Sequence, residues 1–170
     1  MQIQPFTVSI YTENNLGLLN RVTSIFLKRH INIESLTVSE SEIPHVHRFT
    51  IVVKTNTAQI QKIVLQLEKQ VEVIRAYYHT IEETVFQEIA LYKISSESLY
   101  KGELQKVIRK NYARIVEIEP EFLVVEKSGT YQETKKLYEE LTPFGLMQFV
   151  RSGRIAVTRP KMLISEILKQ

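Results

Sequence analysis

The chain has 170 residues, of which 44% are hydrophobic and 24% are charged, enough to build one medium domain or two small ones. Its formal net charge of +3, from 22 basic and 19 acidic residues, indicates no strongly basic surface of the kind that binds nucleic acid. The absence of cysteine excludes disulfides, thiolate metal sites and thiol nucleophiles. No signal-peptide pattern and no apolar run of about 18 residues is present, so we expect a soluble, cytoplasmic protein without membrane association.

The first half of the chain predicts six elements in the order strand, helix, strand, strand, helix, strand. Alternating apolar residues indicate strands, and apolar residues three or four positions apart indicate helices. The apolar phase of the second strand changes by one position, which predicts a β-bulge near Glu34 and Ser35. Asn56 or Thr57 would begin the second helix. The expected strands lie at 6–10, 31–38, 49–53 and 71–78, and the helices have their apolar faces at 18–26 and 60–67.

The same order of elements recurs in the second half. Thr130 and Glu133 form a capping box, which predicts a helix that buries Leu137, Tyr138 and Leu141, together with Thr134. The expected strands lie at 86–94, 113–118, 121–126, 146–150 and 154–158, the other helix at 98–110, and a last amphipathic turn at 161–169.

Together the two halves predict an α+β protein with two tandem βαββαβ units. Each unit would be an antiparallel sheet of the ferredoxin-like kind, with helices on one face. No linker rich in Pro, Gly or Ser separates the units, and the most polar point between them is Glu82 and Glu83. We therefore expect one domain at 1–81 and a second at 82–170.

No catalytic or metal-binding pattern stands out. The chain has no glycine-rich phosphate loop, no G-x-S-x-G and no H-E-x-x-H, and most carboxylates alternate with lysines as on solvated helix faces. His45 and His47 are two apart, so on a strand they would share a face and suit a metal. Because the remaining histidines are only His30 and His79, exposed histidines beside a loop are the favoured interpretation. We expect no catalytic residue and no metal site.

The turn before the first helix is the best candidate for a ligand site. A helix N-terminus has unpaired N–H groups and a positive dipole, which suit a small carboxylate or phosphate. Gly17 would let a ligand approach the backbone, and Asn14 and Asn15 tolerate left-handed conformations. Asn32, at the start of the next strand, has an amide that can bond to an ammonium or a carboxylate. These residues could hold both ends of an α-amino acid, or they could be ordinary turn and cap residues.

The stretch "ENNLGLLNRVTSIFLKRHINIESLTV" at 13–38 fits the pattern E-N-x-x-G-x-L-x-R-V followed by R-G-x-N-I-x-S-L-x-V. It resembles the start of the small, regulatory subunit of acetolactate synthase (acetohydroxyacid synthase). The resemblance continues through "HRFTIVV", "QEIALYKI", "SGTYQETKKLYEEL" and "VRSGRIAVTRP", and so covers nearly the whole chain. Two departures stand near the first motif: His30 replaces the usual Gly, and Asn20 replaces a frequent Ser.

The resemblance implies a non-catalytic regulator whose first domain is an ACT domain. Members of the family pair as homodimers through their ACT domains and bind valine, often also leucine or isoleucine, between two subunits. Carried over by position, the backbone N–H groups of Asn14, Gly17 and Leu18 would bind the carboxylate of valine. Asn32 and the carbonyl of Ile33, from the other subunit, would hold its ammonium group.

The resemblance also implies a partner. The large catalytic subunit would carry thiamine diphosphate, Mg²⁺ and FAD, with no cofactor in this chain, and would condense two pyruvates or pyruvate with 2-oxobutyrate. This chain would activate that subunit and confer feedback inhibition in branched-chain amino acid biosynthesis. The alternative is a free-standing ACT-type amino-acid sensor that regulates another enzyme or transcription. The preferred amino acid, the stoichiometry, and whether a nucleotide or metal also binds stay open at this point.

Overall fold

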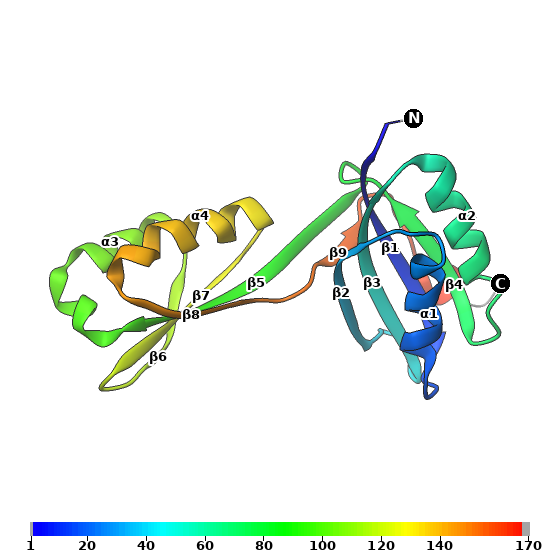
Figure 1. The fold of residues 1–170 in the computed structure, drawn as a ribbon. Helices are drawn as coiled ribbons and strands as arrows, with labels where there is room; N and C mark the ends of the chain where they lie inside the picture. Colours follow the sequence, from blue (N-terminus) through cyan, green and yellow to red (C-terminus); the bar gives the residue numbers. More distant parts are fainter. Residues whose placement is uncertain (1, 168–170) are drawn as a thin grey trace. The chain divides into compact units, whose positions relative to one another are not determined.

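The sheet of the first unit has the strand order β2-β3-β1-β4, and each pair of neighbours is antiparallel. In this computed structural model, which describes residues 2–167, α1 and α2 lie together on one face of that sheet (Figure 1). The predicted order of elements is confirmed. The elements are β1 (Gln4–Glu13), α1 (Leu18–Leu27), β2 (Ile33–Glu40), β3 (Val46–Thr55), α2 (Thr57–Leu67) and β4 (Val73–His79).

The core of this unit lies between the sheet and the two helices. Phe6, Val8 and Ile10 are at most 1% exposed and pack with the apolar faces of α1 and α2. Burial of such side chains is the main favourable term in folding. Of the two predicted starting residues, Asn56 is the N-cap of α2: its side-chain oxygen accepts a hydrogen bond from the N–H of Gln59 at 2.9 Å.

The predicted bulge in β2 is also confirmed. Ile33 pairs with Val53 and Ser35 with Val52, so Glu34 is the extra residue on the β2 side. Because Glu34 is inserted, the apolar side chains after the bulge lie at even instead of odd positions and still point to the same face. This change of phase is the one that the sequence pattern indicated.

The second unit repeats the architecture. Its strand order is β6-β7-β5-β8, and α3 and α4 lie on one side of the sheet (Figure 1). The antiparallel α+β fold with tandem units is thus confirmed. The elements are β5 (Thr84–Ser95), a 3₁₀ helix (Ser96–Lys101), α3 (Glu103–Lys110), β6 (Arg114–Ile118), β7 (Phe122–Gly129), α4 (Tyr131–Leu141), a second 3₁₀ helix (Thr142–Phe144) and β8 (Leu146–Arg151).

Two local expectations in the second unit need correction. The helix expected at 98–110 is divided at Gly102, which has a φ of 65° and separates the 3₁₀ helix from α3. Tyr138 is 38% exposed instead of buried: its ring packs against Phe149, which is itself only partly buried, at the margin of the core. The capping box of Thr130 and Glu133 is present as predicted.

The chain then returns to the first unit through β9 (Ile155–Thr158), which pairs with β5 and precedes the short α5 (Ile164–Ile167). The main-chain N–H of Arg154 donates to the hydroxyl of Ser35 at 3.2 Å, and the hydroxyl of Thr37 donates to the Arg154 carbonyl at 2.8 Å. Arg48 donates to the carbonyl of Ala156 at 2.5 Å. The C-terminal segment therefore covers the sheet face that lacks helices.

The two compact units consequently differ in extent from a simple division of the chain. The first comprises the described residues up to Phe86 together with those from Arg154 onward, and the second comprises residues 87–153. The assignment of an ACT domain to 1–81 and a second domain to 82–170 stays a prediction about function.

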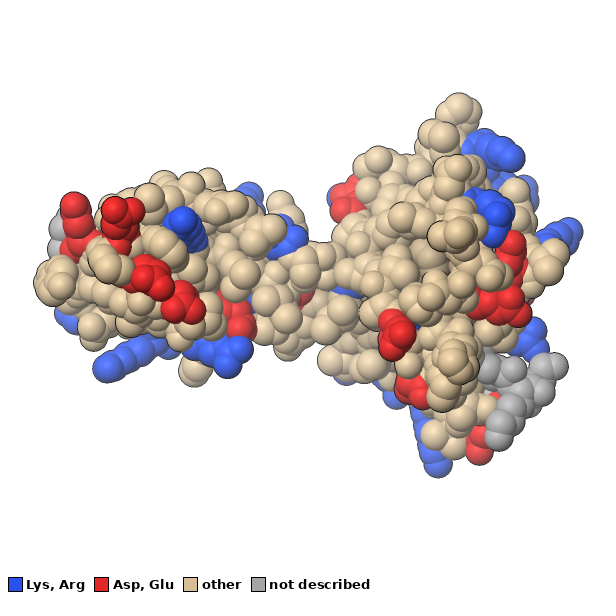
Figure 2. All heavy atoms as spheres, turned by 90° about the horizontal axis from the view of Figure 1, so that it is seen from below, with Lys and Arg blue, Asp and Glu red and all other residues tan. Residues whose placement is uncertain are grey.

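The charge pattern of the first unit is mixed. Figure 2 shows acidic and basic side chains interspersed on the face of this unit that the view presents. That face therefore carries no extended field of one sign. Within residues 2–167, no helix has the length and apolar character needed to cross a bilayer.

Candidate functional site

The turn between β1 and α1 contains a left-handed backbone conformation, as the presence of Gly17 in the sequence indicated. Gly17 is the N-cap of α1 with φ 78° and ψ 0°, in the left-handed region where a side chain is disfavoured. No side chain in the described part of the chain caps this helix, so the turn leaves room for another acceptor at the positive end of the helix dipole. The residue after it, Leu18, is only 4% exposed and anchors the turn in the core.

The asparagines of the turn lie on the surface. Asn14 and Asn15 are both exposed, and the amide of Asn15 donates to the carboxylate of Glu13 at 3.1 Å. The Asn15 carbonyl accepts from the N–H of Leu18 at 3.3 Å, which closes the turn. Asn14, Gly17 and Leu18 are thus brought together, at one end of α1.

Asn32 and Ile33 lie at the other end of the sheet. Ile33 pairs with Val53, which pairs with Phe6 near the start of β1, whereas the turn follows Glu13 at the end of β1. These two levels of β1 are about 23 Å apart at roughly 3.3 Å per residue. One chain therefore does not bring the two halves of the predicted site together.

The strand that follows Asn32 is accessible to a second chain. β2 is an edge strand of the four-stranded sheet, and among the described residues β3 is the only strand that it pairs with. Val38 on this strand is 43% exposed. An edge with free N–H and C=O groups is a common place for one chain to meet another.

The connection that enters β2 explains one departure from the family pattern. His30 has a φ of 55°, in the left-handed region, and its N–H donates to the carbonyl of Leu27 at 2.9 Å. Glycine adopts this conformation without strain, whereas histidine does so at some cost. The tight turn is therefore kept although the glycine is replaced.

The two histidines do not share a strand, contrary to the geometry that would suit a metal. His45 lies in the loop before β3 with a φ of 65°, and only His47 belongs to the strand. Over residues 2–167, no group of three or more His, Cys, Asp or Glu side chains is arranged to hold a metal ion.

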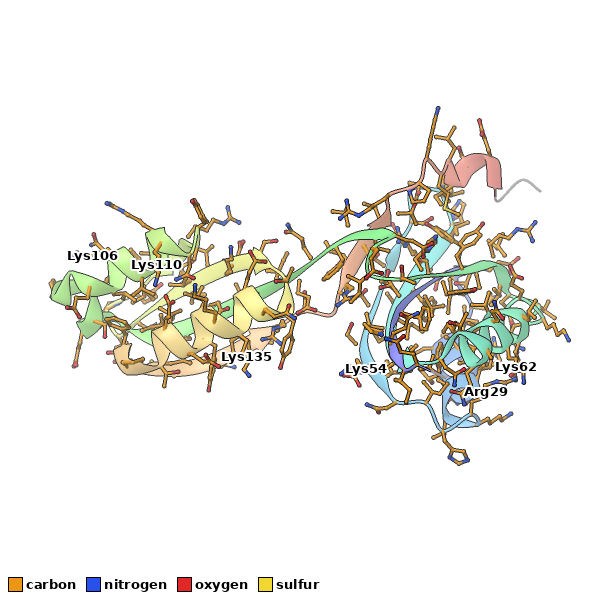
Figure 3. The ribbon with its side chains drawn as sticks, turned by 90° about the horizontal axis from the view of Figure 1, so that it is seen from above. Arg29, Lys54, Lys62, Lys106, Lys110 and Lys135 are labelled. Atoms are coloured by element: carbon orange, nitrogen blue, oxygen red, sulfur yellow. The ribbon has the colours of Figure 1, made fainter. Side chains whose placement is uncertain are left out.

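A depression of about 470 Å³ lies beside α2 and the residues after α1. Arg29 and Lys62 border it, from neighbouring elements of the first unit (Figure 3), together with Lys69. The Nε of Arg29 donates to the side chain of Gln66 at 3.0 Å, and both lysines are exposed. Exposed lysines without a fixed partner hold no ligand in a defined geometry, so this depression is not a built site.

Sequence reasoning missed a further cavity, on the sheet face opposite the helices. Strand alternation places Tyr11 and Tyr77 on that face, next to Arg48. The sequence carries no local signal that residues 157–164 cover them, because that contact joins distant parts of the chain.

Both halves of the chain match known families. Residues 8–75 match the family described as the AHAS small subunit-like ACT domain, and residues 87–160 match the family described as the small subunit of acetolactate synthase. The chain is 33% identical over 153 residues to the acetolactate synthase small subunit of Bacillus subtilis, which covers 89% of each chain. It is 31% identical over 153 residues to that of Mycolicibacterium smegmatis, covering 90% of each chain.

A solved structure agrees with these matches. The crystal structure of the acetolactate synthase small subunit from Thermotoga maritima superimposes with a TM-score of 0.84 at 27% sequence identity. The superposition covers 94% of this chain and 99% of that chain. Sequence and fold therefore agree over nearly the full length, and the chain belongs to the acetolactate synthase small subunit family.

Proposed function

We propose that this chain is the regulatory, non-catalytic subunit of acetolactate synthase in branched-chain amino acid biosynthesis. It binds the large catalytic subunit in the cytoplasm and raises its activity, and valine binding lowers that activity again. Leucine and isoleucine are the further candidates as effectors. Thiamine diphosphate, Mg²⁺ and FAD belong to the catalytic subunit in this proposal. Family membership along nearly the whole chain is the support for this role.

The proposed valine site is shared between two chains of a homodimer. The backbone N–H groups of Asn14, Gly17 and Leu18 bind the carboxylate, with the helix dipole adding a favourable field. Asn32 and the carbonyl of Ile33 from the second chain bind the ammonium group. The observation that carries this proposal is the separation of the two groups at opposite ends of β1, since a small amino acid can join them only across two chains.

Feedback through such a site requires two states of the dimer that differ in valine affinity. A ligand held between two ACT domains stabilises the arrangement in which turn and strand face each other. We propose that this arrangement is the one in which the chain activates its catalytic partner least.

Reconstitution with the separately purified large subunit tests the role. The expected result is that adding this chain raises the rate of acetolactate formation, and that valine reverses the increase. If the chain binds valine but leaves the rate unchanged, the role is that of a free-standing amino-acid sensor.

A complementation experiment tests the shared site. Gly17→Asp should abolish valine inhibition by placing a negative charge against the ligand carboxylate. Asn32→Ala should weaken valine by about 1–3 kcal/mol, because a charged group loses a buried partner. When the two variants are refolded together, the dimers that pair one chain of each variant have one site that combines an intact turn with an intact strand.

Valine inhibition should therefore return in part in the mixture and be absent or weak in each variant alone. A site formed within one chain predicts no recovery. The matched control is a mixture of Gly17→Asp chains with Gly17→Asp, Asn32→Ala double-variant chains, in which every site has a defective turn.

A further inference from the structure

The cavity on the sheet face opposite the helices has a volume of about 360 Å³. Its floor is the sheet face opposite α1 and α2, where Tyr11 of β1 pairs with Arg48 of β3 and Ser9 of β1 pairs with Tyr77 of β4. Its wall is the C-terminal segment from 157 to 164. The volume is within the range of small-molecule sites, roughly 300–1,000 Å³.

Two buried polar atoms at this cavity lack a partner. Among the described residues, neither the hydroxyl of Tyr77 nor the Nε of Arg48 has a hydrogen-bond partner, although both atoms are buried from solvent. Native proteins satisfy nearly all such groups, because a buried donor that forms no bond is unfavourable. Both groups can donate, so each is available to an acceptor on a ligand in the cavity.

Arg48 is held in place for such a role. Its Nη2 donates to the hydroxyl of Ser9 at 3.2 Å and to the carbonyl of Ala156 at 2.5 Å, and its guanidinium lies 5.6 Å from the centroid of the Tyr11 ring. These contacts fix the planar group while leaving its Nε free to bond. A guanidinium in a fixed orientation is well suited to bind a carboxylate or phosphate.

The lining is cationic and partly apolar. Arg159 and Lys161 add positive charge at the rim, against a single carboxylate, that of Glu42. Met162 and Val157 supply apolar surface. Burial raises the pKa of Tyr77, so its hydroxyl keeps its proton and remains a donor at neutral pH.

We propose that this cavity is a second ligand site, which takes a small organic anion whose carboxylate or phosphate is bound by Arg48 and Tyr77. The body of the anion lies against the apolar wall of the C-terminal segment. The site is on the opposite face of the sheet from the turn proposed for valine. An anion bound there ties the C-terminal segment to β3 and β4.

Calorimetric titration of the full-length chain tests the proposal with three probes of similar size: benzoate, phenyl phosphate and benzylamine. The two anions should bind and the cation should not. Binding of benzoate alone assigns a carboxylate ligand, and binding of phenyl phosphate alone assigns a phosphate ligand. Binding of both shows that the site selects charge.

Tyr77→Phe is the decisive variant, because it removes an oxygen that forms no hydrogen bond within residues 2–167. Anion binding should weaken about tenfold or more, as for loss of a hydrogen bond to a charged group. The melting temperature should stay unchanged or rise. Tyr78→Phe is the matched control: Tyr78 packs edge-on against Phe6, and its hydroxyl accepts from Gln61 at 3.3 Å.

The proposal is overturned if neither anion binds at millimolar concentration, or if benzylamine binds as well as the anions. Equal weakening by Tyr77→Phe and Tyr78→Phe would also overturn it, because the effect would then be one of general packing.

Discussion

Arg21 and Glu72 form an ion pair that joins the first turn of α1 to the residue before β4, with 2.6 Å between Nη2 and the carboxylate oxygen. The carbonyl of Glu72 also accepts from the N–H of Glu13 at 3.0 Å. One residue therefore positions both ends of the turn that contains Gly17. Because the two side chains are 43% and 21% exposed, the pair adds at most about 1 kcal/mol of stability. Its contribution is to orient the turn.

Gly17→Asp should remove valine inhibition while activation of the catalytic subunit persists. The new carboxylate would occupy the place proposed for that of the ligand, and among the described residues a Cβ there has only the guanidinium of Arg21 within 4 Å, at 3.8 Å. The left-handed backbone should lower the free energy of unfolding by about 1 kcal/mol. Inhibition curves and chemical denaturation measure the two effects.

Gly17→Asn is the matched control for charge. Asparagine has the same shape as aspartate and tolerates the left-handed region, so it should keep measurable inhibition. If both variants lose inhibition equally, steric blockage and not charge explains the effect. Loss of activation in Gly17→Asp would show that the turn also serves the contact with the catalytic subunit.

Arg154→Met should weaken the attachment of the C-terminal segment to the sheet, while the main-chain bonds of residue 154 to Ser35 and Thr37 stay in place. Arg154 is 8% exposed, donates to the hydroxyl of Thr7 at 3.3 Å and lies 3.8 Å from the centroid of the Phe86 ring. Loss of these contacts should lower the free energy of unfolding by about 2–3 kcal/mol. Urea denaturation measures it, with the exposed Arg159→Met as the control, for which the change should stay within about 0.5 kcal/mol.

His30→Gly should raise the free energy of unfolding by up to about 1 kcal/mol. Relief of the left-handed strain exceeds the extra entropy that glycine gives to the unfolded chain. Lys28→Gly is the control, because Lys28 has a φ of −60° at the end of α1 and gains no relief. It should be destabilising by about 0.5–1 kcal/mol. Equal destabilisation by both variants would mean that the His30 side chain contributes stability of its own.

Glu133 should make stability depend on pH in the acid range. Its pKa is lowered first by the hydrogen bond from the N–H of Thr130, at 2.7 Å, and then by the Thr130 hydroxyl. A lowered folded pKa means that the stabilisation is complete above the ordinary value of 4.5 and is lost as the pH falls through the folded pKa.

Glu133→Gln should therefore reduce stability at neutral pH by a few tenths to about 1 kcal/mol, with a smaller difference in acid. Denaturation at a series of pH values measures this, with Glu139→Gln as a control on the same helix. A difference that is constant with pH would assign the effect to packing.

Local patterns predicted much of the fold. The apolar face of α1 and the capping box of α4 depend on neighbours a few positions apart, and the structure confirms both. The break at Gly102 was missed because the apolar residues on either side keep a helical spacing, and only the backbone conformation of the glycine interrupts it.

Local sequence patterns could not predict contacts between residues that are far apart in the chain. Arg154 and Ser35 are 119 positions apart, and nothing near either residue indicates that they bond. The same holds for the cavity beside Tyr77, which exists only because a distant segment covers the sheet. The turn with Gly17 was predictable as a helix N-terminus with a glycine, whereas its separation from Asn32 emerged only from the strand register.

The return of the chain at Arg154 also has a consequence for biosynthesis. Thr7, Ser9 and Tyr11 are at most 6% exposed, on the sheet face that the last residues cover. During translation the part of the first unit up to Phe86 emerges well before those residues, since chains grow at about 5–20 residues per second. At that rate the sheet face stays uncovered for several seconds until the C-terminal segment is synthesised. During this period a chaperone or a second nascent chain has access to it.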